Sequence, residues 1–365
     1  MNKCSPPCSG GDRNTYDVKN LVSDIVGIAR FTDPLLVNPW GLARSEDGPW
    51  WVADNETRVL TVYAGNGRPF PDRRPQVVAI PNNGSPTGLV YNSVLKSHPT
   101  AFRFSATIGG PISPAVFIAV TEQGSIVAWS PCVDPNNAVA VVTIPGAVYT
   151  GAAIAVVPFD CNQPNATHGP VLFVANFASG QVEAYDRDFL LRGFFTDPEL
   201  ATLCAGNPGQ CFSPFNIAAI GDKHLIVTYA LRGPNGEPVF GPGLGFVDLF
   251  STDGILLKRL VSRGELNAPW GIALAPESKE AGFFGGSLWI GNHGDGRILA
   301  FDPSNGKYIG TVRQIDGLWG LGFAAGEGTD SGPRDRAFFT AGIADEEHGL
   351  FGSLKARDGP VNCCV

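Results

Sequence analysis

Short apolar strands alternate with glycine-rich turns along nearly the whole chain. The clearest unit covers residues 269–312 and has four strand-like segments, at 269–275, 287–292, 297–302 and 307–312, with tight turns before the last two. Four antiparallel strands in about 44 residues is the size of one β-propeller blade. The pattern therefore predicts one blade in this part of the chain.

Five other units follow the same order with decreasing similarity. They begin near residues 39, 86, 150, 214 and 318, several with Pro-Trp-Gly, Pro-Thr-Gly or Leu-Trp-Gly, and each continues into a second apolar strand. Repetition at a period of this length is typical of repeat architectures. We therefore predict an all-β fold, a single six-bladed β-propeller of four-stranded antiparallel blades. Glycine near the start of most inner strands fits this fold, because a side chain there would meet the neighbouring blade.

The two ends of the chain are predicted to meet. Residues 16–22 are strand-like but belong to no unit, and the sixth unit lacks a convincing outer strand. We expect the N-terminal strand to supply it and close the ring, which leaves no open sheet edge. The expected boundaries are a flexible cysteine-containing tail at 1–15, the propeller at 16–352 and a second cysteine-containing tail at 353–365.

Several strings in the units resemble a largely uncharacterised family of NHL-like β-propellers. They lie at 38–42, 121–124, 214–216, 227–230, 267–271, 317–320 and 347–352, in that order along the chain. The resemblance implies a six-bladed propeller and implies no particular reaction. Members commonly carry export signals, whereas the first residues here lack the apolar core of a signal peptide.

Composition narrows the classes of partner. The net charge is −8 and no basic run occurs, which argues against nucleic acid. No uncharged apolar stretch reaches the roughly 18 residues that a membrane span needs. A small-molecule or protein ligand remains the expected partner. The compartment stays open, because the eight cysteines, three glycosylation sequons at Asn55, Asn83 and Asn165 and the resemblance allow a secreted form.

The cysteines lie near the tails and in predicted loops, which favours disulfides. Cys204 and Cys211 flank a turn-rich loop, and theirs is the one disulfide for which both cysteines are specified. Either Cys4 or Cys8 is also expected to reach Cys363 or Cys364 if the ring closes at the termini. Zinc is the alternative, although no two cysteine pairs have finger-type spacing.

Polar residues recur where the second strands end, and in a propeller these ends meet around the axial channel. The channel candidates are Asp54, Asn55, Glu122, Asn176, Tyr229, Asn292 and His293. Lactonase-like propellers hold a metal in a similar channel, and by that analogy Glu122, Asn176 and Asn292 are candidate calcium ligands. His293 or Asp54 would then act as acid or base. The alternative is that these residues only form turns.

Two further sets complete the candidates. The loop 345–349 contains Glu346, Glu347 and His348, which suit metal binding or proton transfer but also suit a solvated acidic loop. Trp40, Trp270 and Trp319 each precede glycine, and we expect them to pack between blades or, alternatively, to rim the channel and stack on a ring-shaped ligand.

The leading functional hypothesis is a non-catalytic propeller that binds a ligand or protein partner at the channel mouth and its loops. The first alternative is a calcium-dependent hydrolase or isomerase acting on a lactone, ester or sugar-like substrate. The second is a structural component of a surface or wall. Fold class alone does not separate them.

Overall fold

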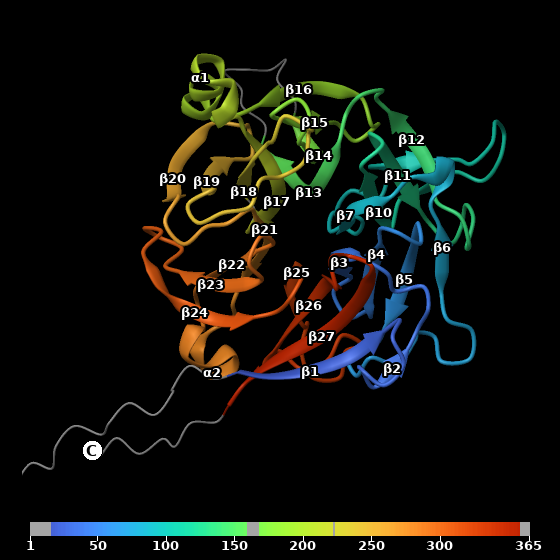
Figure 1. Cartoon of the computed structure of the whole chain (residues 1–365). Coiled ribbons are helices and arrows are strands. Elements are labelled where there is room, and N and C mark those ends of the chain that lie inside the picture. Colours follow the sequence, from blue (N-terminus) through green and yellow to red (C-terminus); the bar gives the residue numbers. More distant parts are fainter. Residues whose placement is uncertain (1–15, 159–167, 222, 358–365) are drawn as a thin grey trace, which may run out of the picture.

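Six antiparallel sheets are arranged in a ring around a central axis (Figure 1). The computed structural model describes residues 16–158, 168–221 and 223–357. Each sheet is one blade, and the innermost strand of each blade faces the axis. The predicted six-bladed β-propeller of four-stranded blades is confirmed.

The first five blades follow the chain from the inner strand outward. Blade 1 consists of β3 (Pro39–Arg44), β4 (Trp50–Asp54), β5 (Val59–Tyr63) and β6 (Val77–Ala79), and blade 2 of β7 (Pro86–Tyr91), β10 (Phe117–Thr121), β11 (Ser125–Trp129) and β12 (Val139–Thr143). Blade 3 consists of β13 (Tyr149–Val157), β14 (Gly169–Asn176), β15 (Gln181–Tyr185) and β16 (Leu191–Phe195), and blade 4 of β17 (Phe212–Ile220), β18 (His224–Leu231), β19 (Gly245–Ser251) and β20 (Leu256–Ser262). Blade 5 consists of β21 (Pro269–Leu274), β22 (Leu288–Asn292), β23 (Arg297–Phe301) and β24 (Tyr308–Gln314). Outside the blades lie a small ribbon of β8 (Arg103–Phe104) and β9 (Ser113–Pro114) and the helices α1 (Pro198–Gly206) and α2 (Ser278–Ala281).

The sixth blade joins both ends of the described chain. Its strands are β25 (Leu318–Phe323), β26 (Arg336–Ile343), β27 (His348–Ala356) and β1 (Tyr16–Ser23), with the short β2 (Phe31–Thr32) beyond. β1 pairs antiparallel with β27, from Tyr16 opposite Ala356 to Ser23 opposite Leu350. The N-terminal strand therefore closes the ring as predicted. β27 continues to Ala356, past the expected limit at residue 352.

Glycine near the start of every inner strand except that of blade 4 lets neighbouring blades approach closely. A Cβ on Gly88 would lie 2.7 Å from Cα of Gly151 in the next inner strand. Gly271 and Gly320 would likewise meet the backbone oxygens of the next blade's tryptophan, at 2.8 and 2.7 Å. Blade 4 has Asn216 at this place, and its Nδ2 donates to the backbone oxygen of Trp270 at 2.8 Å. Close contact is thus kept around the ring.

The cysteine predictions have different outcomes. Cys204 and Cys211 form a disulfide beside α1, which confirms that pair. Cys132 is exposed and is a free thiol. Cys4, Cys8, Cys161, Cys363 and Cys364 lie outside the described residues, so the predicted bond between the tails stays a prediction.

The structure also bears on the glycosylation sequon at Asn55 and on the search for membrane-spanning segments. Asn55 is buried and its amide is hydrogen-bonded, so this sequon offers no accessible acceptor in the folded protein. Within the described ranges, none of the helices is long and apolar enough to span a membrane.

Candidate functional site

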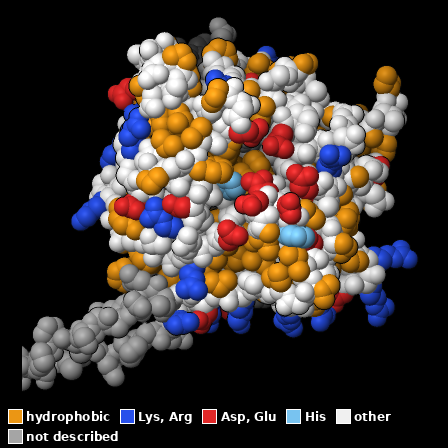
Figure 2. All heavy atoms as spheres, in the orientation of Figure 1, with side chains coloured by type: hydrophobic (Ala, Val, Ile, Leu, Met, Phe, Trp, Pro, Cys, Tyr) orange, Lys and Arg blue, Asp and Glu red, His pale blue; other side chains and the backbone are white. Residues whose placement is uncertain are grey.

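One face of the ring collects the predicted polar residues. We call it the mouth face, where inner strands begin and second strands end: Pro39 lies opposite Asp54, and Pro269 lies opposite Asn292. The other blades pair in the same sense, so six turns converge around the axis. Figure 2 shows acidic side chains gathered at the centre of this face, with a histidine among them. This face is the candidate site.

His293 and Glu346, from blades 5 and 6, form the central polar contact of the mouth. His293 Nε2 lies 3.1 Å from Glu346 Oε1, and its Nδ1 lies 3.2 Å from the backbone oxygen of Leu318. Asn38 Nδ2 donates to Glu346 Oε2 at 2.8 Å, and Asn38 Oδ1 accepts from Trp319 Nε1 at 3.1 Å. The imidazole is thus fixed at both nitrogens, and the Glu346 carboxylate at both oxygens.

A floor of buried aromatic rings lies beneath this network. The His293 ring stacks on Trp319 with centroids 3.6 Å apart, and Trp319 stacks on Trp40 at 3.5 Å. Trp270 packs edge-on against both indoles, and its Nε1 donates at 3.0 Å to the backbone oxygen of Thr150. All three tryptophans are buried. They pack against one another near the axis, and their faces are not available to a ring-shaped ligand at the mouth.

Glu122, in the turn after β10, adds a second carboxylate with a different environment. Its Oε2 accepts from Asn55 Nδ2 at 3.2 Å. Burial raises the pKa of Glu122; the Asn55 hydrogen bond opposes this, and the negative charges of Glu237, Glu346 and Glu56 raise it further. Three carboxylates therefore act on Glu122, and together with it they give the mouth a negative potential.

Glu346 is held in its ionised form. Burial alone would raise the pKa of its carboxyl, but the hydrogen bond from His293, the charge of His293 and the Asn38 hydrogen bond together lower it. Its backbone is strained, because Ala344, Asp345 and Glu346 have φ angles of 54°, 54° and 69°. Three consecutive left-handed residues with a Cβ are unfavourable, and tertiary contacts must maintain them.

The residues of the acidic loop around Glu346 lie in different environments. Glu347 is exposed. His348 is the first residue of β27, and its Nδ1 lies 2.6 Å from Asp24 Oδ2 in the N-terminal segment. Of the three predicted residues Glu346, Glu347 and His348, only Glu346 contacts the centre of the mouth.

The insertion between β18 and β19 also reaches the mouth, and the sequence alone did not assign it to either face. Glu237 from this segment acts electrostatically on Glu122. Phe240 packs edge-on against His293, with centroids 5.2 Å apart, and is 52% exposed. Asn267 Oδ1 accepts from the backbone nitrogen of Gly241 at 2.7 Å and anchors the segment. The insertion therefore adds an exposed aromatic wall beside the acidic centre.

Two of the channel candidates point into the interior of the fold. Asp54 is fully buried, its Oδ2 accepts from Thr61 Oγ1 at 2.7 Å, and burial raises its pKa well above the usual value. Tyr229 is buried in the core between blades 3 and 4. Burial and the nearby Asp248 carboxylate raise the pKa of its hydroxyl. Neither residue is placed to act on a ligand at the mouth.

The candidate calcium ligands have other hydrogen-bond partners. Asn176 Oδ1 accepts from the backbone of Val148 at 3.3 Å, and its Nδ2 donates to Glu183 at 2.7 Å. Asn292 Oδ1 accepts from the backbone of Asn267 at 3.1 Å. These amides orient turns within their own blades. Among the described residues, no group of three or more His, Cys, Asp or Glu side chains is placed to hold a metal.

Comparison with solved structures gives a distant likeness. Virginiamycin B lyase from Staphylococcus aureus aligns over 93% of this chain and 99% of its own, with 12% identity and a TM-score of 0.48. This likeness says nothing about activity here. No family model matches the chain, so the narrower NHL-like family is not confirmed.

Comparison with curated proteins identifies clear relatives in Acanthamoeba polyphaga mimivirus. "Uncharacterized protein R648" is 33% identical over 353 residues, covering 93% of this chain and 80% of the relative. "Uncharacterized protein L690" is 33% identical over 355 residues, covering 93% of this chain and 86% of the relative. The chain therefore belongs to the protein family that contains these two mimivirus proteins.

Proposed function

We propose that this protein is a non-catalytic binding propeller whose mouth holds a positively charged group of a ligand. The observation that carries the proposal is the gathering of acidic side chains at the centre of the mouth face (Figure 2), where the negative charges of Glu237, Glu346 and Glu56 act on Glu122. Complementary charge favours a cation there, and the exposed ring of Phe240 adds a surface for its apolar stem or for a cation–π contact. An alkylammonium or guanidinium group has this chemistry.

Glu122 is the residue best suited to receive such a group. Asn55 donates to only one of its oxygens, and among described residues no hydrogen bond is formed by Oε1. The raised pKa of Glu122 also reflects repulsion by its neighbours, and a bound cation would relieve that repulsion. Glu346, by contrast, already has hydrogen-bond partners at both oxygens and contributes through its charge.

Spermidine is a suitable first probe, because it carries several ammonium groups on a flexible chain. We expect calorimetry to show binding that weakens as salt is added, since partly exposed charges are screened. Glu122→Gln and Glu346→Gln should each weaken binding roughly five- to tenfold. The matched control is Glu277→Gln, an exposed glutamate after β21, on the opposite face. Equal losses in all three variants, or no binding to the wild type, would refute the proposal.

The calcium-dependent alternative makes a different prediction. A stoichiometric calcium site would raise the melting temperature when calcium is added, and Glu122→Gln would abolish the shift. We expect millimolar calcium to leave the melting temperature of both proteins unchanged, because the oxygens of Asn176 and Asn292 accept backbone hydrogen bonds. A calcium-dependent shift lost in Glu122→Gln would favour the metal-dependent function instead.

A further inference from the structure

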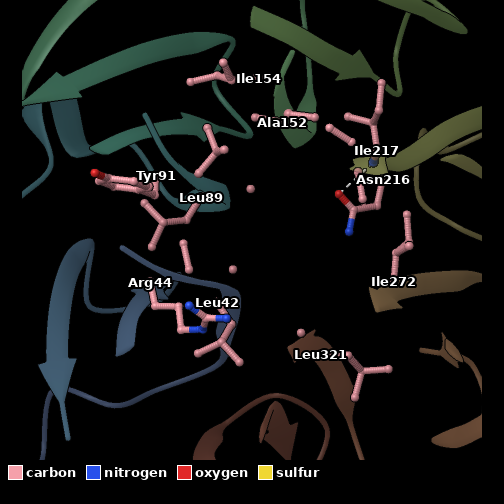
Figure 3. Close-up of a pocket in the computed structure, with 18 of the residues that line it drawn as sticks. Leu42, Arg44, Leu89, Tyr91, Ala152, Ile154, Asn216, Ile217, Ile272 and Leu321 are labelled. Atoms are coloured by element: carbon pink, nitrogen blue, oxygen red, sulfur yellow. Dashed lines mark hydrogen bonds between the residues drawn. The ribbon is translucent and has the colours of Figure 1, made fainter. Parts of the chain in front are cut away.

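A cavity lies on the axis on the other side of the tryptophan floor from the mouth. It has a volume of about 320 Å³, is open on one side, and is lined by residues from all six inner strands (Figure 3). Its walls come from the halves of these strands remote from the mouth, such as 41–44 of β3 and 88–91 of β7. Trp270 lines its inner end. The volume lies at the low end of the range for ligand pockets, roughly 300–1,000 Å³.

Aliphatic side chains dominate the interior of this cavity. Figure 3 shows them converging from different blades, and they include Leu42, Leu89, Ile154, Ile217, Ile272 and Leu321. Asn216, Tyr91 and Ser93 add polar side chains to the wall, and the amide of Asn216 is already hydrogen-bonded to the backbone of Trp270 and Ile217. The aliphatic side chains offer packing surface to an apolar chain, and the polar groups of the wall offer partners to its head group.

One charged side chain lines the same cavity. Arg44, the last residue of β3, donates to the backbone oxygens of Phe323 at 2.8 Å and of Ser45 and Glu46 at 3.2 Å. All of these acceptors are neutral carbonyls, and within the described ranges Arg44 forms no salt bridge. Burial lowers the pKa of Arg44, and the nearby positive charge of Arg334 lowers it further, with an opposing effect of Asp47.

Arg44 is partly buried, and its guanidinium has lost part of its hydration without gaining an anionic partner; a bound carboxylate would supply the missing charge. We propose that the axial cavity binds a small aliphatic carboxylate, with its chain among Leu42, Leu89 and Leu321 and its carboxylate at Arg44. This site lies on the opposite side of the tryptophan floor from the mouth. The inference therefore stands whether or not the mouth binds a cation.

Hexanoate and its uncharged analogue hexanamide test the proposal on the unmodified protein. Ligand-observed NMR and calorimetry should show that hexanoate binds and that hexanamide binds at least about tenfold more weakly, because the amide cannot neutralise Arg44. This comparison involves no mutation and does not depend on the folding of a variant. Equal affinity for both compounds, or no binding of hexanoate at millimolar concentration, would overturn the proposal.

Two variants then locate the site. Ala152→Leu should abolish hexanoate binding by filling the cavity, and Arg44→Gln should reduce it to the level of hexanamide. Arg313→Gln is the matched control, since Arg313 is exposed on the outer strand β24. Glu122→Gln should leave hexanoate binding unchanged, which separates this site from the mouth. Unchanged hexanoate binding in a folded Ala152→Leu protein would place the ligand elsewhere and refute the assignment.

Discussion

Replacing Gly88 by alanine is expected to destabilise the protein by about 3 kcal/mol, as overpacking against rigid backbone does. The new Cβ would lie 2.7 Å from Cα of Gly151 and 2.8 Å from the backbone nitrogen of Ala152. Both contacts belong to β13, the inner strand of the next blade, and neither can move without shifting that strand. Equilibrium unfolding in guanidinium chloride would measure the loss.

Gly193→Ala is the matched control for this prediction. Gly193 lies in the outer strand β16, and a Cβ there would meet no atom within 4 Å. We expect its free energy of unfolding to change by less than about 0.5 kcal/mol, as for most surface substitutions. If Gly88→Ala costs no more than Gly193→Ala, close packing of inner strands is not what constrains this glycine.

The same glycines explain why the sequence was sufficient to predict the ring. Gly88, Gly271 and Gly320 each occupy the third position of an inner strand, and spacing alone shows that the position repeats. Closure was also predictable, because residues 16–22 had strand character and no place in any unit. The third strand of blade 6 has no clear signal in the sequence. His348 was taken as part of an acidic loop, whereas β27 starts there.

From the sequence, only the location of the candidate site at the mouth face could be predicted. Repeats show that second strands end at one face, but they do not show which way each side chain points. Glu122 and His293 reach the mouth, whereas Asp54 turns inward to Thr61. Phe240 lies in an insertion that no repeat describes, and long-range contacts such as that of Asn267 with Gly241 fix its position. Such contacts have no local signature in the sequence.

Arg259→Ala is expected to destabilise the protein by about 3 kcal/mol or more, because it leaves buried acidic groups without their cation. The guanidinium pairs with Asp197, with Asp248 at 3.2 Å and with Glu199 at 3.0 Å. The Asp197 and Asp248 side chains are both fully buried. Asp197 also caps α1 by accepting from the backbone nitrogens of Glu199 and Leu200, at 2.7 and 3.1 Å. Unfolding in denaturant measures the loss.

The control for Arg259 is again Arg313→Gln, which removes an exposed arginine from an outer strand. It should leave stability within about 0.5 kcal/mol of the wild type. We also expect Arg259→Ala to loosen the helix that carries Cys204, which faster hydrogen exchange across α1 would report. A variant as stable as Arg313→Gln would show that the buried carboxylates do not depend on Arg259.

We expect the titration of Asp248 to lower the free energy of unfolding as the pH rises toward 8. Burial, together with the hydrogen bond and negative charge of Asp197, raises the pKa of Asp248 to about 8, despite the opposing effect of Arg259. The folded protein therefore holds a proton that the unfolded chain releases near its ordinary pKa of 3.8. The contribution of this proton to the free energy of unfolding is complete below the ordinary pKa. Above it, the contribution declines by at most about 1.4 kcal/mol per pH unit, and it is lost as the pH rises through the pKa of Asp248 in the folded protein.

Asp248→Asn tests this linkage, because asparagine keeps the shape of the side chain and cannot titrate. Asp197, whose pKa is lowered, takes up its proton below the window from pH 5 to 8 and does not mask the effect. We expect the wild type to lose stability across that window and Asp248→Asn to lose clearly less, as measured by denaturant unfolding at pH 5, 6, 7 and 8. Equal slopes for the two proteins would mean that Asp248 is already ionised in the folded state at pH 5, with Arg259 neutralising both carboxylates.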